Sequence, residues 1–329
     1  MKDIIKELTE AYGPSGREEP VRDILKGMVE PFADEVEVDN MGNLIVRKKG
    51  PGKKIMVAAH MDELGLMVTY IDDEGFLRFS NVGGISPYIL MGERVVFQNG
   101  LKGVVGYEKL DSIKELKFSK MYIDIGASDR KEAEEKVRIG DVAVYSRSFS
   151  HSGERITAKA LDDRVGCAVL VQTLKELEKP DNDLFFVFTV QEEVGVRGAR
   201  TSAYKINPDM GLAVDVTRTG DTPEAETMAV SLGKGPTVKV KDTLIITHPR
   251  VKELMIDRAE KNNISYQLEV LERGGTDSGA IHLTREGVPS GVMSIPCRYI
   301  HTPSEMADYG DVREGVKLLK SILHKKITL

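Results

Sequence analysis

The run from Leu184 to Val190 most strongly constrains what this chain can fold into. Its sequence, LFFVFTV, contains almost only aromatic and β-branched or aliphatic residues. A short run of this kind is typical of a strand that is buried on both faces, as in sheets with helices packed on either side. We therefore expect an α/β protein with a mixed sheet flanked by helices.

Two carboxylates, Glu192 and Glu193, follow directly after this strand. Ligand sites in open α/β sheets form at the carboxyl ends of the strands, where loops and helix N-termini meet. Neighbouring side chains on an extended segment point in opposite directions, so we expect the two glutamates to have different roles. A solvated acidic turn is the alternative interpretation of this pair alone.

Ligand-type residues are also found in two other predicted strands. The apolar segment 55–59 leads into His60, and the apolar segment 211–216 contains one charged residue, Asp215. A carboxylate in such a strand must be paired or coordinated, because an isolated buried charge is costly. A structural salt bridge is the alternative role of Asp215.

Two further candidates lie outside strands. Asp162 and Asp163 open a predicted helix that extends to about residue 178. Helix capping is an alternative role for these aspartates, and above all for Asp163. His301 lies in a loop beyond the last predicted strand, Val292–Ile295.

The combined set holds two histidines, three carboxylates and no thiolate: His60, Asp162, Glu193, Asp215 and His301. Imidazole and carboxylate ligands suit divalent cations such as zinc or cobalt. Five ligands exceed what one tetrahedral zinc takes, but they suit two cations that share a bridging carboxylate. Asp162 is the expected bridge. His60 and Asp215 would complete one site, and Glu193 and His301 the other.

Glu192 and Asp62 are the expected catalytic residues of this centre. Asp62 lies two residues after His60 and could accept the free imidazole N–H, which would fix the tautomer of the ligand. Glu192 would act as the general base, taking a proton from the water that the metals activate and passing it to the leaving group.

Between residues 67 and 159 the sequence changes to short strands that are separated by glycine-containing turns. This pattern predicts a small β-barrel or sandwich, with one short helix capped near Asp129. We interpret it as a domain inserted into a catalytic domain formed by residues 1–66 and 160–329. The inserted segment contains no cluster of ligand-type residues.

The charge and composition of the chain limit which partners the protein can bind and where in the cell it is expected. The chain of 329 residues carries a net charge of −6 and has no basic run, which argues against nucleic-acid binding. The charged amino terminus and the lack of eighteen consecutive apolar residues predict a cytoplasmic protein with no membrane partner. Many Lys and Glu residues, few Gln and no Trp favour a thermophilic source.

The glycine-rich segment from Arg273 to Ala280 opens another predicted helix. It matches no phosphate-binding motif, so we interpret it as a loop that lets the backbone approach a substrate. Gly275, Thr276 and Asp277 are the candidate substrate-binding residues. Three arginines, Arg218, Arg250 and Arg273, could form a basic pocket for an acidic first residue, although all three could instead be surface charges.

The successive motifs of the chain resemble those of the dinuclear metallo-aminopeptidases that form tetrahedral (TET) particles. The motifs are HMDE from His60, ALDDR from Ala160, QEEVG from Gln191, Asp215, and HTPSE from His301. That family includes glutamyl and deblocking aminopeptidases and members once labelled endoglucanases. The resemblance spans the whole chain and shows no departure at a ligand or base position.

This resemblance implies that peptides are the substrates and that the inserted domain builds dimers and, from them, a hollow dodecamer. The older endoglucanase label makes a glycosidase the main alternative. Retaining or inverting glycosidases need two carboxyl groups that face each other across the sugar, whereas adjacent strand residues point apart. A non-catalytic peptide-binding scaffold is the third possibility. The presence of Glu192 argues against it.

Overall fold

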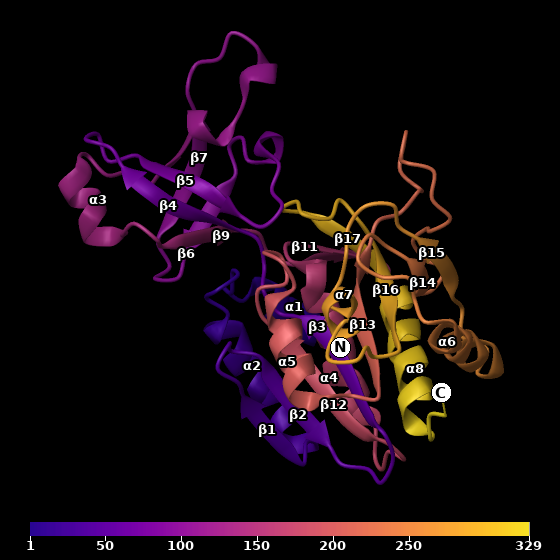
Figure 1. Ribbon diagram of the computed structural model, residues 1–329. Helices are drawn as coiled ribbons and strands as arrows, with labels where there is room; N and C mark the ends of the chain where they lie inside the picture. Colours follow the sequence, from indigo (N-terminus) through magenta and orange to yellow (C-terminus); the bar gives the residue numbers. More distant parts are fainter. Residues whose placement is uncertain (329) are drawn as a thin grey trace.

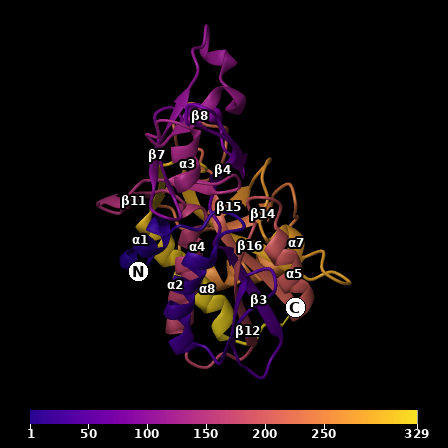
Figure 2. The ribbon, with the colours of Figure 1, turned by 90° about the vertical axis from the view of Figure 1, so that its left-hand side faces the viewer.

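The apolar run that begins at Leu184 forms most of strand β12 (Asp183–Thr189), and six of the seven residues of this strand are buried. The computed structural model describes residues 1–328. It consists of an α/β body and a separate β-barrel that projects from one end of it (Figures 1 and 2). The predicted fold class, a mixed sheet flanked by helices with a small barrel, is confirmed.

The large sheet is mixed. Besides β12 it contains β1 (Glu35–Val38), β2 (Leu44–Lys48), β3 (Lys54–His60), β10 (Ser150–Ser152), β11 (Arg155–Ala158), β13 (Met210–Thr217), β14 (Thr237–Lys241), β15 (Gln267–Val270), β16 (Ser290–Arg298) and β17 (Glu305–Asp308). The strand order is β1-β2-β12-β3-β13-β16-β17-β11-β10, with β14 and β15 branching from β16. At its centre β12, β3, β13 and β16 run parallel, so their carboxyl ends meet at one edge.

Helices cover both faces of this sheet. One face carries α1 (Lys2–Glu10), α2 (Glu19–Val29), α4 (Leu161–Glu176), α6 (Pro249–Lys261) and α8 (Tyr309–His324); the other carries α5 (Arg197–Ile206) and α7 (Ser278–Ile281). Helix α4 packs on β3 and β13 and is itself covered by α1, α2 and α8. This position between sheet and helices explains why most residues of α4 are buried.

The inserted domain is a closed antiparallel barrel with the strand order β4-β5-β8-β7-β6-β9. Its strands are β4 (Gly65–Ile71), β5 (Leu77–Val82), β6 (Arg94–Phe97), β7 (Lys102–Tyr107), β8 (Met121–Asp124) and β9 (Val142–Tyr145). It has its own core, which includes Leu77 and Met121. Its helix α3 (Arg130–Lys136) is capped by Asp129, whose side chain accepts a hydrogen bond from the Glu132 N–H at 2.8 Å.

Two features of the sheet differ from the sequence-based expectation. The barrel strands end at Tyr145, and β10 and β11, which lie within the expected insert 67–159, pair instead into the large sheet through β17. Strand β16 was expected to be the last strand, but β17 follows it and pairs with both β16 and β11. In the part of the chain that the structure describes, no helix is long and apolar enough to cross a membrane.

Candidate metal centre and active site

The candidate site lies at the edge where the parallel strands end. His60 is the last residue of β3 and pairs with Thr189, the last residue of β12. Glu192 and Glu193 follow β12, and Asp215 lies near the end of β13. Because these strands run in the same direction, residues far apart in the sequence gather at one place.

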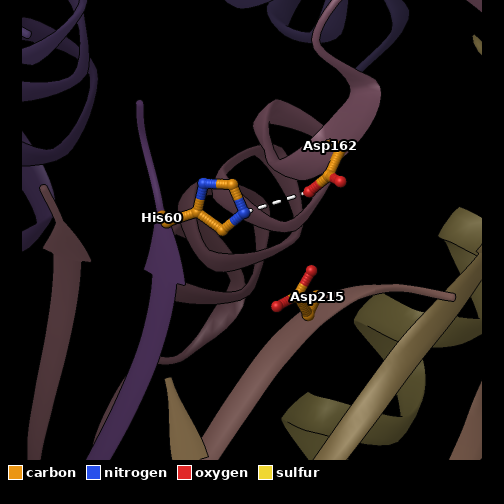
Figure 3. Close-up of side chains that lie close together, drawn as sticks. All are labelled: His60, Asp162 and Asp215. Carbon is orange, nitrogen blue, oxygen red and sulfur yellow. Dashed lines mark hydrogen bonds and ion pairs between the residues drawn. The ribbon is translucent and has the colours of Figure 1, made fainter. Parts of the chain in front are cut away.

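One group of ligand-type atoms is formed by His60, Asp162 and Asp215 (Figure 3). The three ligand atoms lie within 4.8 Å of one another. His60 Nε2 is 3.0 Å from Asp162 Oδ1, and all three side chains are buried. Asp162 reaches this group from the start of α4, where its φ and ψ of −77° and 104° are not helical.

A second group is formed by Asp162, Glu193 and His301. His301 Nε2 lies 3.3 Å from Asp162 Oδ2 and 3.4 Å from Glu193 Oε2. Asp162 therefore belongs to both groups and turns a different oxygen toward each histidine. This is the arrangement that a carboxylate bridging two cations requires.

The electrostatics of the residues present fit a divalent metal. Burial raises the pKa of Asp215 well above its usual range, and burial together with the charge of Asp162 raises that of Glu193 to about 7. Within residues 1–328, the buried Glu193 Oε1 has no hydrogen-bond partner. Several carboxylates are thus gathered without enough protein cations to balance them, and bound cations would remove this cost.

Glu305 holds two of the candidate ligands by their backbone. Its Oε2 accepts a hydrogen bond from the Asp162 N–H at 2.9 Å, and its Oε1 accepts one from the His301 N–H at 2.7 Å. Glu305 lies in the HTPSE motif, but no role was predicted for it from the sequence. A buried charge in the short strand β17 was the available signal, but β17 itself was not predicted.

The barrel also contributes to this site. The carbonyl of Gly84, just beyond β5, lies 2.9 Å from His301 Nδ1 and accepts its N–H. A Cβ on Gly84 would lie 3.1 Å from that same nitrogen, so the close approach favours glycine. The barrel domain therefore orients a candidate ligand of the α/β body.

Glu192 lies beside the first group, with Oε2 4.0 Å from His60 Nε2. Burial raises its pKa well above the usual range of a glutamate, which suits a proton acceptor. Glu192 and Glu193 do not lie on an extended strand, because β12 ends before them and Gln191 adopts a φ of 54°, which starts a turn. Both line the same pocket, but Glu192 lies near His60 whereas Glu193 lies near His301.

Asp62 is arranged differently from the expectation. The hydrogen bond from His60 Nδ1 goes to the Asp62 carbonyl at 3.2 Å, whereas the Asp62 carboxylate lies 3.6 Å from that nitrogen. The carboxylate instead accepts the N–H groups of Glu192 at 3.0 Å and Glu193 at 3.2 Å. Asp62 thus contacts both the first ligand and the turn that carries the candidate base.

A pocket of about 280 Å³ opens onto the two groups. Gly275 lines it, but Thr276 and Asp277 are buried and are not among its lining residues. The Asp277 carboxylate accepts a hydrogen bond from the Thr189 hydroxyl at 2.5 Å instead. Of the three arginines considered, Arg218 and Arg273 line the pocket, whereas Arg250 lies in α6.

Lys239 lines the same pocket and was not identified from the sequence. It is fully buried in β14, where its Nζ lies 3.1 Å from Glu269 and 3.4 Å from Asp242. Its partners come from β15 and from the loop after β14, and such a pairing leaves no periodic signal in the sequence.

The family model that describes the M42 glutamyl aminopeptidases matches residues 42–318. The chain belongs to this family. It is a family of metallopeptidases, so the protein is a peptide-bond hydrolase whose site is built for divalent metal. This membership favours peptide hydrolysis over the glycosidase alternative, although one solved structure 36% identical to the chain is described as an endoglucanase.

Full-length relatives carry related names. The chain is 56% identical to a putative aminopeptidase of Acetivibrio thermocellus over 97% of both chains. It is 36% identical to the lysyl aminopeptidase of Pyrococcus furiosus, over 98% of this chain and 96% of the relative.

Solved structures share both domains. An aminopeptidase from Desulfurococcus kamchatkensis is 42% identical with a TM-score of 0.95, over 98% of this chain and 94% of the other. The TET1 peptidase of Pyrococcus horikoshii, described as assembling into a tetrahedron or a large octahedral shell, is 35% identical with a TM-score of 0.88 over 98% of both chains.

Proposed function

We propose that the protein is an aminopeptidase that uses two divalent cations, zinc or cobalt, to remove N-terminal residues from peptides. The arrangement of Asp162 carries this proposal. One of its carboxylate oxygens faces His60 and the other faces His301, and each histidine is accompanied by one further carboxylate. His60 and Asp215 would hold one cation, and Glu193 and His301 would hold the other. Asp162 would bind both cations.

Glu192 is the general base of this proposal. It is the pocket-lining carboxylate that belongs to neither ligand group, and burial raises its pKa above the usual range of a glutamate, which suits a proton acceptor. When bound, the cations would polarise the scissile carbonyl and lower the pKa of water. Glu192 would take the proton from the attacking water and deliver it to the departing amine, while Asp62 holds the Glu192 backbone.

The charge of the pocket supports removal of residues from the amino terminus. Its lining includes the carboxylates of Asp162, Glu192, Glu193 and Asp215. An α-ammonium group is attracted to these carboxylates, which belong to the two ligand groups and to the candidate base. The free amine of the peptide would therefore lie beside the metal ligands.

Arg218 and Arg273 support a preference for acidic first residues. Both are exposed at the pocket that contains the metal ligands, and within residues 1–328 neither forms an ion pair. Guanidinium groups bind carboxylates with two hydrogen bonds, so they would stabilise a Glu or Asp side chain in this pocket. The relatives' names include both glutamyl and lysyl substrates, so the pocket residues must decide the preference.

A panel of aminoacyl chromogenic substrates tests this function. We expect hydrolysis that a chelator abolishes and that zinc or cobalt restores, with Glu and Asp substrates preferred. Arg218→Ala and Arg273→Ala should raise KM for the Glu substrate and leave the Leu substrate nearly unchanged, with Arg250→Ala as the control. Preference for Leu or Lys would refute acidic specificity, and chelator-resistant hydrolysis would refute the metal centre.

We further propose that the chain forms a homo-oligomer, a dodecamer, through its barrel domain, while the α/β body, which includes β10 and β11, forms the catalytic domain. The shape of the chain supports this, since the barrel projects from the body (Figure 1). Large side chains of the barrel domain, such as Tyr88 and Ile139, are exposed. Light scattering should give the mass of twelve copies of the 36.4 kDa chain. The mass of a monomer would contradict the proposal.

A further inference from the structure

Four consecutive backbone N–H groups in the turn after β12 donate hydrogen bonds to side chains from other parts of the chain. Val190 N–H donates to Asn43 Oδ1 at 3.0 Å, and Gln191 N–H donates to Glu18 Oε1 at 3.1 Å. The next two, those of Glu192 and Glu193, donate to the carboxylate of Asp62. The turn that carries the candidate base is thus held by side chains at every residue.

The three acceptors come from separate segments and are all buried. Asn43 follows the turn between β1 and β2, Glu18 immediately precedes α2, and Asp62 follows β3. Backbone N–H groups in a turn normally bond to neighbouring backbone or to water, so four successive side-chain acceptors indicate a conformation imposed by the surrounding structure.

Each acceptor is itself fixed in place. Asn43 Nδ2 donates to Asp39 Oδ2 at 2.7 Å and to the Gly198 carbonyl at 3.1 Å. A Cβ on Gly198 would lie 2.2 Å from Asn43 Oδ1, so only glycine leaves room for this contact. Glu18 Oε1 also accepts the Gly16 N–H at 2.7 Å, and Asp62 Oδ2 accepts the Ser15 hydroxyl at 2.6 Å.

We propose that Asn43 and Glu18 are positioning residues that hold the Glu192 carboxylate in its productive place, with Ser15 supporting the same turn through Asp62. This inference rests on the proposed role of Glu192 as general base. Catalytic groups must be held close to their productive geometry, and a displacement of about 1 Å can lower the rate about 100-fold. Asn43 and Glu18 touch the backbone before Glu192 and neither lines the pocket.

Kinetics of the metal-loaded protein test the proposal. Glu18→Ala and Asn43→Ala should lower kcat by about 10- to 100-fold, while KM and the number of bound metal ions stay unchanged. Glu18→Gln keeps the Oε1 acceptor and should restore most of kcat. Two controls should keep full activity: Glu19→Ala, an exposed neighbour, and Asn182→Ala, a buried asparagine just before the opposite end of β12.

Hydrogen exchange gives a readout that does not depend on activity. The amides of residues 190–193 should exchange slowly in the wild-type protein, and Glu18→Ala should speed the exchange of the Gln191 amide selectively. Fast exchange of these four amides in the wild-type protein would overturn the proposal even if the alanine variants failed to fold.

Unchanged kcat in Glu18→Ala and Asn43→Ala would likewise overturn it, as would loss of metal from these variants, which would indicate a purely structural role. An inactive wild-type protein that still shows slow exchange at residues 190–193 would contradict the proposed function and not the arrangement of the turn.

Discussion

At the scale of single residues, the two adjacent glutamates Glu192 and Glu193 differ in their surroundings and therefore in their proposed roles. Glu193 lies within reach of Asp162 and His301 and is a candidate metal ligand, whereas Glu192 lies 4.0 Å from His60 and belongs to neither ligand group. The two residues therefore offer a matched pair of isosteric substitutions that distinguish catalysis from metal binding.

Glu192→Gln removes the proton acceptor and keeps the shape of the side chain. We expect kcat to fall by about 10²- to 10⁴-fold, the usual contribution of a general base, with two metal ions still bound. Steady-state kinetics and elemental analysis measure the two quantities. Glu193→Gln, as the control, should bind less metal. Turnover close to the wild-type rate in Glu192→Gln would show that another group is the base.

The stability of the metal-free protein should depend on pH near neutrality. Burial raises the pKa of Glu193 and of Glu18 from 4.5 to about 7. Between pH 4.5 and 7 the folded protein therefore binds protons that the unfolded chain has released, so the free energy of unfolding falls as pH rises. For Glu18 this difference corresponds to about 3 kcal/mol.

Thermal unfolding in the presence of a chelator measures this effect. The Tm should be higher at pH 5.5 than at pH 7.5, and Glu18→Gln should reduce the difference. A Tm that rises over this range would contradict the assignment of these carboxyl groups as buried and uncompensated.

The residues of the site were predictable from the sequence to different degrees. His60 and Asp215 stood out because strand periodicity places them at or near strand ends, where ligands gather. Glu305 was not recognised, because its role consists of hydrogen bonds to backbone N–H groups that only the folded chain brings near. Thr276 and Asp277 were expected in the pocket, but their loop turns them into the interior.

At the scale of elements, a buried ion pair between Glu63 and Lys159 links the connection between β3 and β4 to the segment that follows β11. Glu63 Oε2 lies 2.6 Å from Lys159 Nζ, and both side chains are 3% exposed. Arg164 of α4 approaches the other oxygen of Glu63 at 3.6 Å. These segments carry His60 and Asp162, so the pair joins two elements that present candidate ligands.

Breaking this pair should be costly. Lys159→Met leaves Glu63 buried without its main partner, and we expect a loss of about 3–5 kcal/mol in the free energy of unfolding. Urea denaturation measures this loss, and adding Glu63→Gln should recover part of it. Arg313→Ala removes the half-exposed pair with Glu154 and should cost at most about 1 kcal/mol. Equal losses in the two single variants would contradict the account.

Sequence patterns predicted the elements that are strongly apolar and missed those that depend on distant pairing. Strand β12 and helix α4 were identified from their apolar residues, and most residues of both elements are buried in the structure. Strands β10, β11 and β17 are short, and two of them carry charged residues. The pairing of β11 with β17 joins residues about 150 positions apart, which no local period reveals.

At the scale of the whole molecule, the barrel and the α/β body meet at the candidate metal centre. The Gly84 carbonyl of the barrel accepts the Nδ1 hydrogen of His301, and a Cβ on Gly83 would lie 3.3 Å from the Cβ of Glu193. The strand pattern of residues 67–159 predicted an inserted domain, but this contact was not predicted, because that segment contains no cluster of ligand-type residues. The barrel, for which we propose a role in assembly, thus also contacts the second ligand group.

The proposed metal centre depends on Asp162 bridging two cations. Anomalous X-ray diffraction from crystals of the zinc-loaded protein would locate these cations. We expect two anomalous peaks on either side of the Asp162 carboxylate, one beside His60 and Asp215 and the other beside Glu193 and His301. A single peak, or two peaks that do not share Asp162, would contradict the bridging role of Asp162.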